Sequence, residues 1–320
     1  MTSVRAFTAS APGKIILFGE HAVVYGFPAI AVPLAAVQVT VSAETASPGG
    51  GITLHAADLG RTLSLTDMQP DDPLYDALVY PVQLALQALR RPSADLRLTV
   101  RSTIPVASGL GSGAALAAAL IRAVCGALGQ PIDDDSLNPL VYEVEKRHHG
   151  TPSGIDNTTI VYARPVYFVR GQPPQTFAVA RPFTLLVADT GQSSPTRLTV
   201  ADVRSQYDSE PDRTGALLAR IGAIAEAARR AIETGDLAAL GLLMDENHTL
   251  LSALTVSSDL LDRLCQTARA AGAQGAKLSG GGRGGNMIAL VQEENAEVIA
   301  EALRQAGAVR VLTTRVGPQG

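Results

Sequence analysis

The sequence predicts an α+β protein with two lobes. Strand-like patterns concentrate in the first half, where "VQVTVSAE" and "DLRLTVRSTIP" alternate apolar and polar residues. Helical spacing dominates after residue 213, and this segregation of strands from helices is typical of α+β proteins. A length of 320 residues also exceeds what one hydrophobic core usually serves. We expect lobes over residues 1–175 and 176–320, divided between residues 165 and 185.

The same patterns predict the order of the elements. Residues 12–45 read as extended structure interrupted by turns, and "GGGITLHA" with "RTLSLTD" predicts a further hairpin. A strand, a glycine-rich loop and a helix follow one another around residue 110. Helices are expected over residues 72–89, 113–128, 137–149, 214–234, 236–252, 258–271 and 294–306.

Charge and cysteine content favour a cytoplasmic protein with a small-molecule partner. The net charge is −4 with mixed signs along the chain, so we expect neither nucleic acid nor a membrane surface as a partner. Arg122 interrupts the best candidate for a membrane span, and "IILF" is too short for a signal peptide. Cys125 and Cys265 lack metal-ligand spacing and read as small buried hydrophobes in a reducing compartment.

Lysine is scarce in this chain. Only Lys14, Lys146 and Lys277 are lysines among the 26 basic residues. A genome that disfavours lysine codons explains the scarcity, but the three survivors can also mark places that need a compact ammonium group. Lys14 and Lys277 both fall within glycine-rich segments.

The stretch "IPVASGLGSGAALAAAL" places glycines directly before an apolar helix. Glycine allows positive φ and close approach to a ligand, and the first turn of a helix leaves amide groups unpaired at its positive end. Together they form an anion site suited to nucleotide phosphates. The stretch matches neither a Walker loop nor GxGxxG. Tight packing of the helix on a strand is the alternative interpretation.

Two further segments carry charged residues beside glycines. In "APGKIILFGEHAVVYG", Lys14 precedes an apolar strand and Glu20 and His21 follow it, which favours a site because an unpaired charge beside a buried strand is costly. In "EVEKRHHGTPSGIDN", Gly150, Pro152 and Gly154 place Asp156 on a stiff turned loop, where catalytic carboxylates often lie. A helix cap or Asx turn is the alternative for Asp156.

The stretch "KLSGGGRGGNMIAL" has five glycines around Arg283 before an apolar strand. A flexible tip would be unusual there. We interpret it as a backbone loop that something must approach closely, such as a polyphosphate backed by another loop.

These segments, in this order, resemble the GHMP kinases, and the resemblance runs from Ala11 to Leu290. The first motif of that family is similar to "APGKIILFGEHAVVYG", its phosphate loop to "IPVASGLGSGAA" and its third motif to "KLSGGGRGGN". "GEHAVVYG" together with "HHGTPSGIDN" is most similar to the branch that phosphorylates mevalonate on its primary hydroxyl. The resemblance implies an N-terminal lobe of the ribosomal protein S5 domain 2-like type and a ferredoxin-like α/β-sandwich C-terminal lobe. It places nucleotide and substrate in a cleft between them, and suggests a homodimer.

The resemblance also implies roles for individual residues. Asp156 is implied as the catalytic carboxylate, with Lys14 as its partner at the substrate hydroxyl and Glu145 as a ligand of Mg²⁺ on the phosphates of ATP. Substrate binding is implied for Lys14, Glu20, His21, Asp156 and, in a weaker match of "DTGQSSPT", Thr196. Phosphate binding is implied for Pro105, Val106, Ala107, Ser108, Gly109, Leu110, Gly111, Ser112, Gly113 and Ala114.

Two departures from the family pattern bear on function. The family usually has two serines after the Gly-Leu-Gly turn, but here Gly113 follows Ser112, so either Ser112 or water completes the metal shell beside Glu145. Arg283 interrupts the last glycine motif and can pair with a phosphate or with a surface carboxylate.

The alternatives to mevalonate as the acceptor are phosphomevalonate, homoserine or a sugar. The alternative to a kinase is a sensor of the same fold that binds a ligand without turnover. A dinucleotide-dependent oxidoreductase is disfavoured because its glycine fingerprint is absent.

Overall fold

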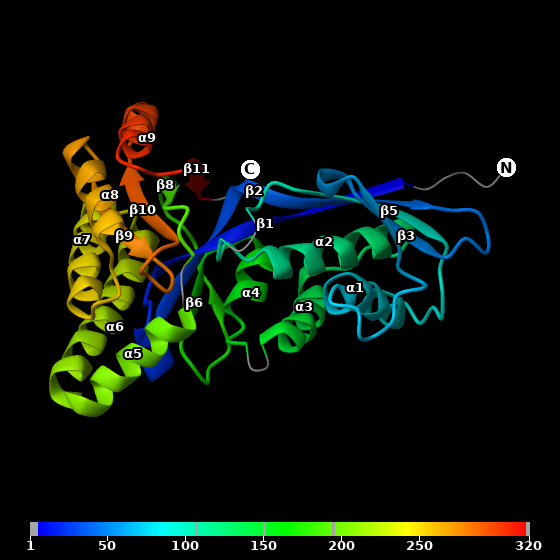
Figure 1. The fold of residues 1–320 in the computed structure, drawn as a ribbon, viewed down its shortest axis with the longest axis horizontal. Helices are drawn as coiled ribbons and strands as arrows, with labels where there is room; N and C mark the ends of the chain where they lie inside the picture. Colours follow the sequence, from blue (N-terminus) through cyan, green and yellow to red (C-terminus); the bar gives the residue numbers. More distant parts are fainter. Residues whose placement is uncertain (1–5, 106–107, 150–151, 194–195, 318–320) are drawn as a thin grey trace. The chain divides into compact units, whose positions relative to one another are not determined.

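The computed structural model describes residues 6–105, 108–149, 152–193 and 196–317 (Figure 1). The chain forms two compact units, which are described separately. The first unit comprises Met1–Gly13, Val37–Val106 and Leu110–Ala163, and the second comprises Lys14–Ala36, Ala107–Gly109 and Arg164–Gly320.

This division differs from the boundary expected between residues 165 and 185. The strands β1 (Ala6–Phe18) and β2 (Ala29–Thr45) are long enough to contribute to both units. The last residues of β1, the first residues of β2 and the turn between them form residues 14–36. These residues belong to the second unit, although they lie early in the sequence.

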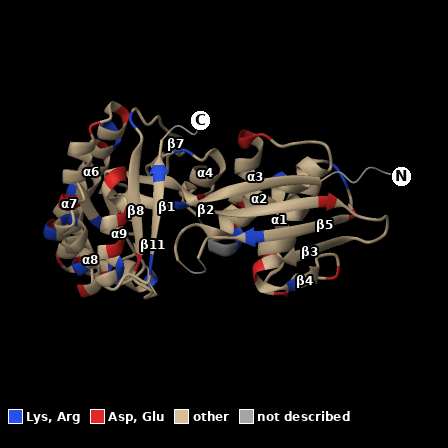
Figure 2. Ribbon diagram, turned by 90° about the horizontal axis from the view of Figure 1, so that it is seen from above, with Lys and Arg blue, Asp and Glu red and all other residues tan. Residues whose placement is uncertain are grey.

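The first unit is a sheet covered on one face by helices (Figure 2). β5 lies between β2, with which it is antiparallel, and β3, with which it is parallel. β4 pairs with the far edge of β3, and β1 pairs with β2. Its remaining elements are β3 (Ile52–Ala56), η2 (Ala57–Leu59), β4 (Arg61–Ser64), α1 (Tyr75–Ala88), β5 (Leu96–Ser102), α2 (Ser112–Ala127), α3 (Asp134–His149) and α4 (Ile155–Tyr162).

α2 is the central helix of this unit and packs against α1, α3 and α4. Gly126 allows β1 to approach it closely, because a β-carbon added there would lie 2.3 Å from the ring of Phe7. Arg122, its interior charge, donates to the carbonyls of Ser10 and Val161 and to the carboxylate of Asp134. One guanidinium therefore joins α2 to β1, α3 and the last turn of α4.

The second unit is built on an antiparallel sheet with the strand order β11-β8-β10-β9. β6 and β7 form a separate ladder against the first residues of β2. Its elements are η1 (Ala22–Tyr25), β6 (Val166–Phe168), β7 (Gln175–Thr176), β8 (Phe183–Asp189), α5 (Thr196–Ser209), α6 (Pro211–Thr234), α7 (Leu237–Ala253), α8 (Asp259–Ala270), β9 (Gly275–Ser279), β10 (Asn286–Val291), η3 (Glu293–Asn295), α9 (Ala296–Gln305) and β11 (Arg310–Val316).

Both faces of β9 and β10 are buried, although the two faces differ in chemistry. Ala276 and Leu278 of β9 and Met287 of β10 belong to the apolar core shared with α8 and α9. Because successive side chains of a strand point to opposite faces, Lys277 and Ser279 face away from that core. The second face is therefore buried but partly polar.

The expected helices are confirmed, with ends shifted by a few residues. The sequence patterns did not predict α4 or α5. α4 consists largely of β-branched residues, whose intrinsic preference is for strands. No helix in the part of the chain that the structure describes combines the length and hydrophobicity needed to span a bilayer.

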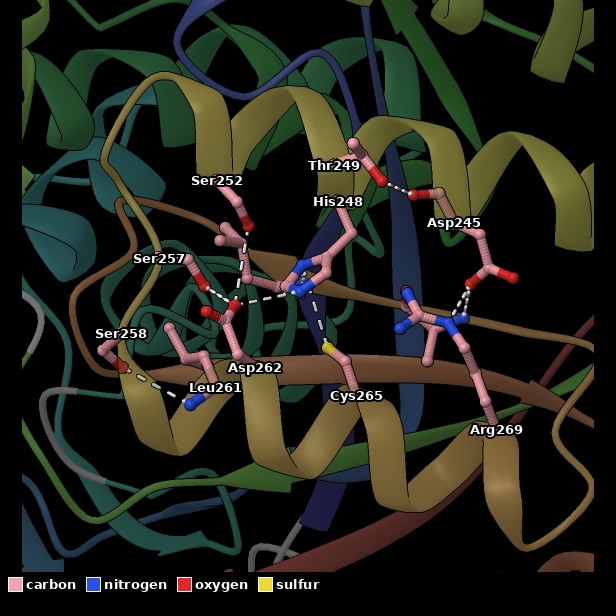
Figure 3. A network of polar contacts seen from close by, with 12 residues as sticks. Asp245, His248, Thr249, Ser252, Ser257, Ser258, Leu261, Asp262, Cys265 and Arg269 are labelled. Carbon is pink, nitrogen blue, oxygen red and sulfur yellow. Dashed lines mark hydrogen bonds and ion pairs between the residues drawn. The ribbon is translucent and has the colours of Figure 1, made fainter.

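A polar network joins α7, α8 and β9 in the second unit (Figure 3). His248 of α7 lies 3.1 Å, through Nε2, from Oδ1 of Asp262 of α8. The backbone N–H of Leu278 donates to His248 Nδ1 at 3.3 Å. Since Nδ1 accepts this bond, the proton of the neutral ring lies on Nε2 and is donated to Asp262.

The thiol of Cys265 lies 3.8 Å from His248 Nδ1, which brings a cysteine, a histidine and an aspartate together. Burial raises the pKa of Cys265 to about 12, and burial is also the main cause that lowers the pKa of His248 to about 4. The thiol therefore stays protonated and the imidazole stays neutral near pH 7. These values describe a structural contact rather than an activated nucleophile.

We expect His248 to make stability depend on pH. The unfolded chain protonates this imidazole near its ordinary pKa of 6.5, whereas the folded chain does so only near pH 4. The unfolded state thus binds more protons between these values, so the unfolding free energy should fall by about 2 kcal/mol more between pH 7 and pH 5 in the parent than in His248→Gln. Urea unfolding of both proteins at the two pH values measures this difference, and equal pH dependence would contradict it.

We also expect that the contact between α7 and β9 leaves no room for a side chain at Gly275. A β-carbon at Gly275 would lie 2.1 Å from the carbonyl oxygen of Gly241, so Gly275→Ala should destabilise the protein by about 2–3 kcal/mol or more. The control is Gly215→Ala in α6, where the added carbon meets only Tyr207 at 3.7 Å and should stabilise by about 0.5–1 kcal/mol. Chemical unfolding followed by circular dichroism compares them, and equal stability of Gly275→Ala and the parent would refute the prediction.

Candidate functional site

The expected phosphate loop leads into α2. Gly109 and Gly111 have positive φ values of 73° and 79°, and Gly111 is the N-cap of α2. Both residues therefore adopt a left-handed backbone conformation that glycine adopts without strain. The unpaired amide N–H groups of the first turn of α2 point toward this loop. Val106 and Ala107 lie outside the described residues. Of the others expected here, Leu110 and Ala114 are buried and Pro105, Ser108, Gly109, Gly111, Ser112 and Gly113 are half-buried or exposed.

Glu145 of α3 faces this helix start within the first unit. Its side chain is buried, and a β-carbon added at Gly113 would lie 3.6 Å from Glu145 Oε1. The exposed hydroxyl-bearing Ser112 is the first residue of α2. A carboxylate and a hydroxyl are hard oxygen ligands, so the residues present fit a divalent cation that takes its other ligands from phosphates and water. Within the described residues, no cluster of three or more His, Cys, Asp or Glu forms a protein-only metal site.

Asp156 lies in the first turn of α4, not on the loop that the sequence predicted. Gly154, with φ 87°, turns the chain into the helix, and the half-buried Asp156 follows two residues later. Its neighbour Asn157 is buried and donates through Nδ2 to Asn138 Oδ1 at 2.7 Å. The carboxylate is thus carried by a helix start whose positive dipole end favours its charge. The link between Asn157 and Asn138 anchors α4 to α3.

In the second unit, Lys14 is buried near the middle of β1 and Glu20 is buried after its end. Glu20 Oε1 forms an ion pair with the ammonium group of Lys277, which also donates to the carbonyl of Leu278 at 2.7 Å. Burial lowers the pKa of Lys277, and Glu20 offsets part of that shift. Glu20 Oε2 is buried and lacks a hydrogen-bond partner among the described residues.

His21 lies in a strained backbone conformation, with φ 60°. Its Nε2 lies 3.0 Å from the carbonyl oxygen of Gly281, so Nε2 carries the proton and Nδ1 is an acceptor. Burial lowers the pKa of His21, the Gly281 carbonyl acts in the opposite direction, and Arg283 adds to the lowering. The ring is therefore neutral near pH 7. Nδ1, like Glu20 Oε2, is a buried atom with no hydrogen-bond partner in the described part of the chain.

The glycines of the last motif fit against protein backbone. A β-carbon at Gly282 would lie 1.9 Å from the carbonyl oxygen of Val256, and one at Gly284 would lie 2.7 Å from that of Ser193. The close approach that the sequence indicated is therefore made by the chain itself at these two positions. At Gly280, by contrast, an added β-carbon would meet no atom within 4 Å.

Arg283 pairs with a carboxylate, the second of the two alternatives left open by the sequence. Its guanidinium forms an ion pair with Asp202 of α5 and donates through Nε to the carbonyl of Thr255 at 3.1 Å. Its backbone N–H donates to Val256 at 2.9 Å. Arg283 thus fixes the glycine-rich loop to α5 and to the turn after α7.

Thr196 is the exposed first residue of α5. The loop before it meets the glycine-rich loop: Thr190 Oγ1 donates to the carbonyl of Gly285 at 2.8 Å, and Gly285 N–H donates to Gln192 at 2.9 Å. This places the loop of residues 189–193 beside the third motif, while Ser194 and Pro195 lie outside the described residues. A role for Thr196 in substrate binding stays a prediction.

Sequence reasoning gave no role to Ser279 or Asn286. Ser279 Oγ donates to the carbonyl of Ile16 at 2.7 Å, and Asn286 Nδ2 donates to the carbonyl of Ser108 at 2.8 Å. Among the residues of this face, Lys277 had a detectable signal, because it is one of only three lysines. A serine and an asparagine beside glycines carry no comparable signal.

Comparison with known proteins agrees with this architecture. The model of the GHMP kinases N-terminal domain matches residues 77–164, and that of the GHMP kinases C-terminal domain matches residues 225–309. Two curated relatives are the mevalonate kinases of Thermococcus sibiricus, 37% identical over 95% of each chain, and of Aeropyrum pernix, 35% identical over 99% of this chain and 98% of the other. The chain belongs to the GHMP kinase family.

Solved structures give the same result. The mevalonate kinase of L. major in complex with R-mevalonate superposes with a TM-score of 0.83 and 29% identity, covering 98% of this chain and 97% of the other. The mevalonate kinase of Methanococcus jannaschii superposes with a TM-score of 0.84 and 26% identity over 98% of both chains. As a kinase of this family, the protein uses ATP and, as is usual, a divalent metal.

Proposed function

We propose that this protein is a mevalonate kinase, which transfers the γ-phosphoryl group of ATP to the primary hydroxyl of (R)-mevalonate and forms 5-phosphomevalonate. The observation that carries this proposal is the similarity, over nearly the whole chain, to kinases named for that acceptor. The chain also contains Asp156 and Lys14, a carboxylate and an ammonium group of the kind that can act on an alcohol acceptor.

Two buried acceptor atoms in the second unit support a hydroxylated substrate. Glu20 Oε2 and the Nδ1 atom of neutral His21 belong to adjacent residues, and both lack a hydrogen-bond partner among the described residues. A buried acceptor without a partner is costly, and alcohol groups are donors that can satisfy it. We therefore assign Glu20 and His21 to acceptor binding, together with Lys14, Asp156 and Thr196.

We assign the phosphates of ATP to the loop of residues 105–114, whose glycines and helix-start amides suit polyphosphate. Glu145 and Ser112 would hold Mg²⁺, which offsets the negative charge of the β- and γ-phosphates when bound. The chain's own contribution is chiefly to position the reactants, because phosphoryl transfer requires little covalent participation by the protein.

Asp156 and Lys14 act on the acceptor in this proposal. Asp156 orients the attacking hydroxyl and accepts its proton, while Lys14 stabilises the negative charge that develops on the same oxygen. The oxygen then forms the new bond to phosphorus as the bond between the γ-phosphorus and the bridging oxygen breaks, and ADP leaves.

The remaining expectations concern the protein's setting. We propose a cytoplasmic location, supported by the free, buried thiols of Cys125 and Cys265, which suit a reducing compartment. The acceptor and ATP are the proposed partners, with neither nucleic acid nor membrane. A homodimer stays a prediction, which light scattering of the purified protein tests.

The acceptor is tested by incubating the protein with Mg-ATP and, in parallel, mevalonate, phosphomevalonate, homoserine or galactose. ADP release with mevalonate alone, and a product heavier by one phosphoryl group, is the expected result. Turnover of a different acceptor would show that the protein is a kinase but that its substrate is not mevalonate. Nucleotide binding with no turnover of any acceptor would instead favour the sensor.

We expect Asp156→Asn and Lys14→Met to fold, to bind ATP and to lose turnover. General acid–base assistance contributes roughly a hundredfold to ten-thousandfold, so kcat should fall by at least that range. Steady-state kinetics with mevalonate, alongside circular dichroism and nucleotide titration, measures the loss. Turnover within threefold of the parent would refute the roles given to these residues.

We expect Gly113→Ser to bind Mg²⁺ more tightly than the parent. The new hydroxyl would lie beside Glu145 Oε1 and add a hard oxygen ligand, so Mg²⁺ affinity in the presence of ADP should rise severalfold. Gly113→Ala is the matched control, because it adds the same β-carbon without the oxygen. Calorimetric titration with Mg²⁺ compares the three proteins, and equal affinity of the serine and alanine variants would contradict the placement of the metal.

A further inference from the structure

Three polar side chains occupy the face of β9 and β10 that points away from α8 and α9. Lys277 and Ser279 alternate along β9 with Ala276 and Leu278, which belong to the apolar core. Asn286 of β10 is the register partner of Ser279. We call Lys277, Ser279 and Asn286 the positioning row. All three are buried, so each must find its hydrogen-bond partners inside the second unit.

Two members of the row bind the chain that runs from Lys14 to His21, here called the acceptor segment. Lys277 pairs with Glu20, and Ser279 Oγ donates to the carbonyl of Ile16 at 2.7 Å. Two residues beyond Ser279, the carbonyl of Gly281 accepts the bond from His21 Nε2. Alternate residues of one short stretch therefore hold the acceptor segment at three points.

The third member contacts the phosphate loop. Asn286 Nδ2 donates to the carbonyl of Ser108 at 2.8 Å. Asn286 is 6% exposed and Ser108 is half-buried, so this bond is partly shielded from water. Because Ser279 and Asn286 are register partners, one pair of strands contacts both the acceptor segment and the loop assigned to ATP.

The contact between Lys277 and Glu20 is the costliest of these to disturb. Lys277 is 0% exposed and its ammonium lies 5.7 Å from the ring centre of Phe18. Removing one member of a buried ion pair leaves the other charge without compensation, and the chain around it must rearrange to reach water. Here, that chain is the acceptor segment.

We propose that Lys277, Ser279 and Asn286 are positioning residues for phosphoryl transfer, with Lys277 and Ser279 fixing the acceptor segment and Asn286 fixing the nucleotide loop at Ser108. None of the three needs to touch the reacting atoms. The division between acceptor and nucleotide rests on the function proposed above. The contacts that define the positioning row do not depend on that function.

The positioning row predicts that each substitution changes the KM for one substrate and not the KM for the other. Lys277→Met should raise the KM for mevalonate at least tenfold and leave the KM for ATP within threefold. Asn286→Ala should raise the KM for ATP about fivefold or more and leave the KM for mevalonate within threefold. A general loss of stability would lower both affinities together, so the split distinguishes positioning from a purely structural role.

Hydrogen exchange measured by mass spectrometry tests the row without any acceptor. Exchange in the peptide covering residues 14–21 should accelerate at least tenfold in Lys277→Met, and exchange around Ser108 should accelerate in Asn286→Ala, each without the other. Arg220→Met is the matched control, because it breaks a cation–carboxylate pair of the same unit, with Glu246 at 2.6 Å, that lies on the exposed surface. Arg220→Met should change neither the hydrogen exchange of these two peptides nor the KM for either substrate.

The outcomes are distinct. Unchanged exchange and unchanged KM values in Lys277→Met and Asn286→Ala would overturn the inference, and so would equal changes of both peptides in each variant. If Lys277→Met does not fold, Ser279→Ala replaces it, since it removes one hydrogen bond and no charge; we then expect a smaller, roughly threefold effect on the same peptide and the same KM. If the parent does not phosphorylate mevalonate, the proposed function fails, and the exchange pattern alone decides the inference.

Discussion

The buried ion pair between Lys277 and Glu20 is the constraint on which the second unit depends. An ammonium group with no exposure to water is tolerated only when a carboxylate and a carbonyl satisfy it, and Glu20 and Leu278 do so. Breaking such a pair by removing one partner typically costs about 3–5 kcal/mol. The pair therefore fixes the end of β1 against β9, and with it the strand that carries Lys14.

The first unit obtains the same kind of order by different means. α2 begins at the end of the loop to which we assign the phosphates, and Arg122 near its middle donates to β1, α3 and α4 with one guanidinium. The short helix α4 has too few residues to be stable alone, so its contacts hold Asp156 in place. In each unit, a buried or half-buried cation thus contacts an element that carries a side chain to which we propose a catalytic role.

Much of the fold follows from the sequence, because the long helices show the 3.6-residue period over several turns. The exceptions have physical reasons. α4 was missed because Thr158, Thr159 and Ile160 favour strands, and tertiary contacts override that preference. Periodicity identifies β1 and β2 as strands, but it does not show that both strands contribute residues to two units.

The candidate site was predictable in composition but not in its contacts. Glycine at residues 282 and 284 indicates close approach equally well for a phosphate and for a carbonyl, and the structure places carbonyls there. The sequence likewise shows Lys277 and Glu20 as two charges 257 residues apart. Only the fold shows that they neutralise each other.

A crystal structure with mevalonate and a non-hydrolysable ATP analogue tests the central claim most directly, because it locates the reacting hydroxyl and the side chains that contact it. The account predicts the C5 hydroxyl of mevalonate within hydrogen-bond distance of the Asp156 carboxylate and the Lys14 ammonium, with the phosphates on the loop of residues 105–114. A C5 hydroxyl in contact with neither residue would contradict the account.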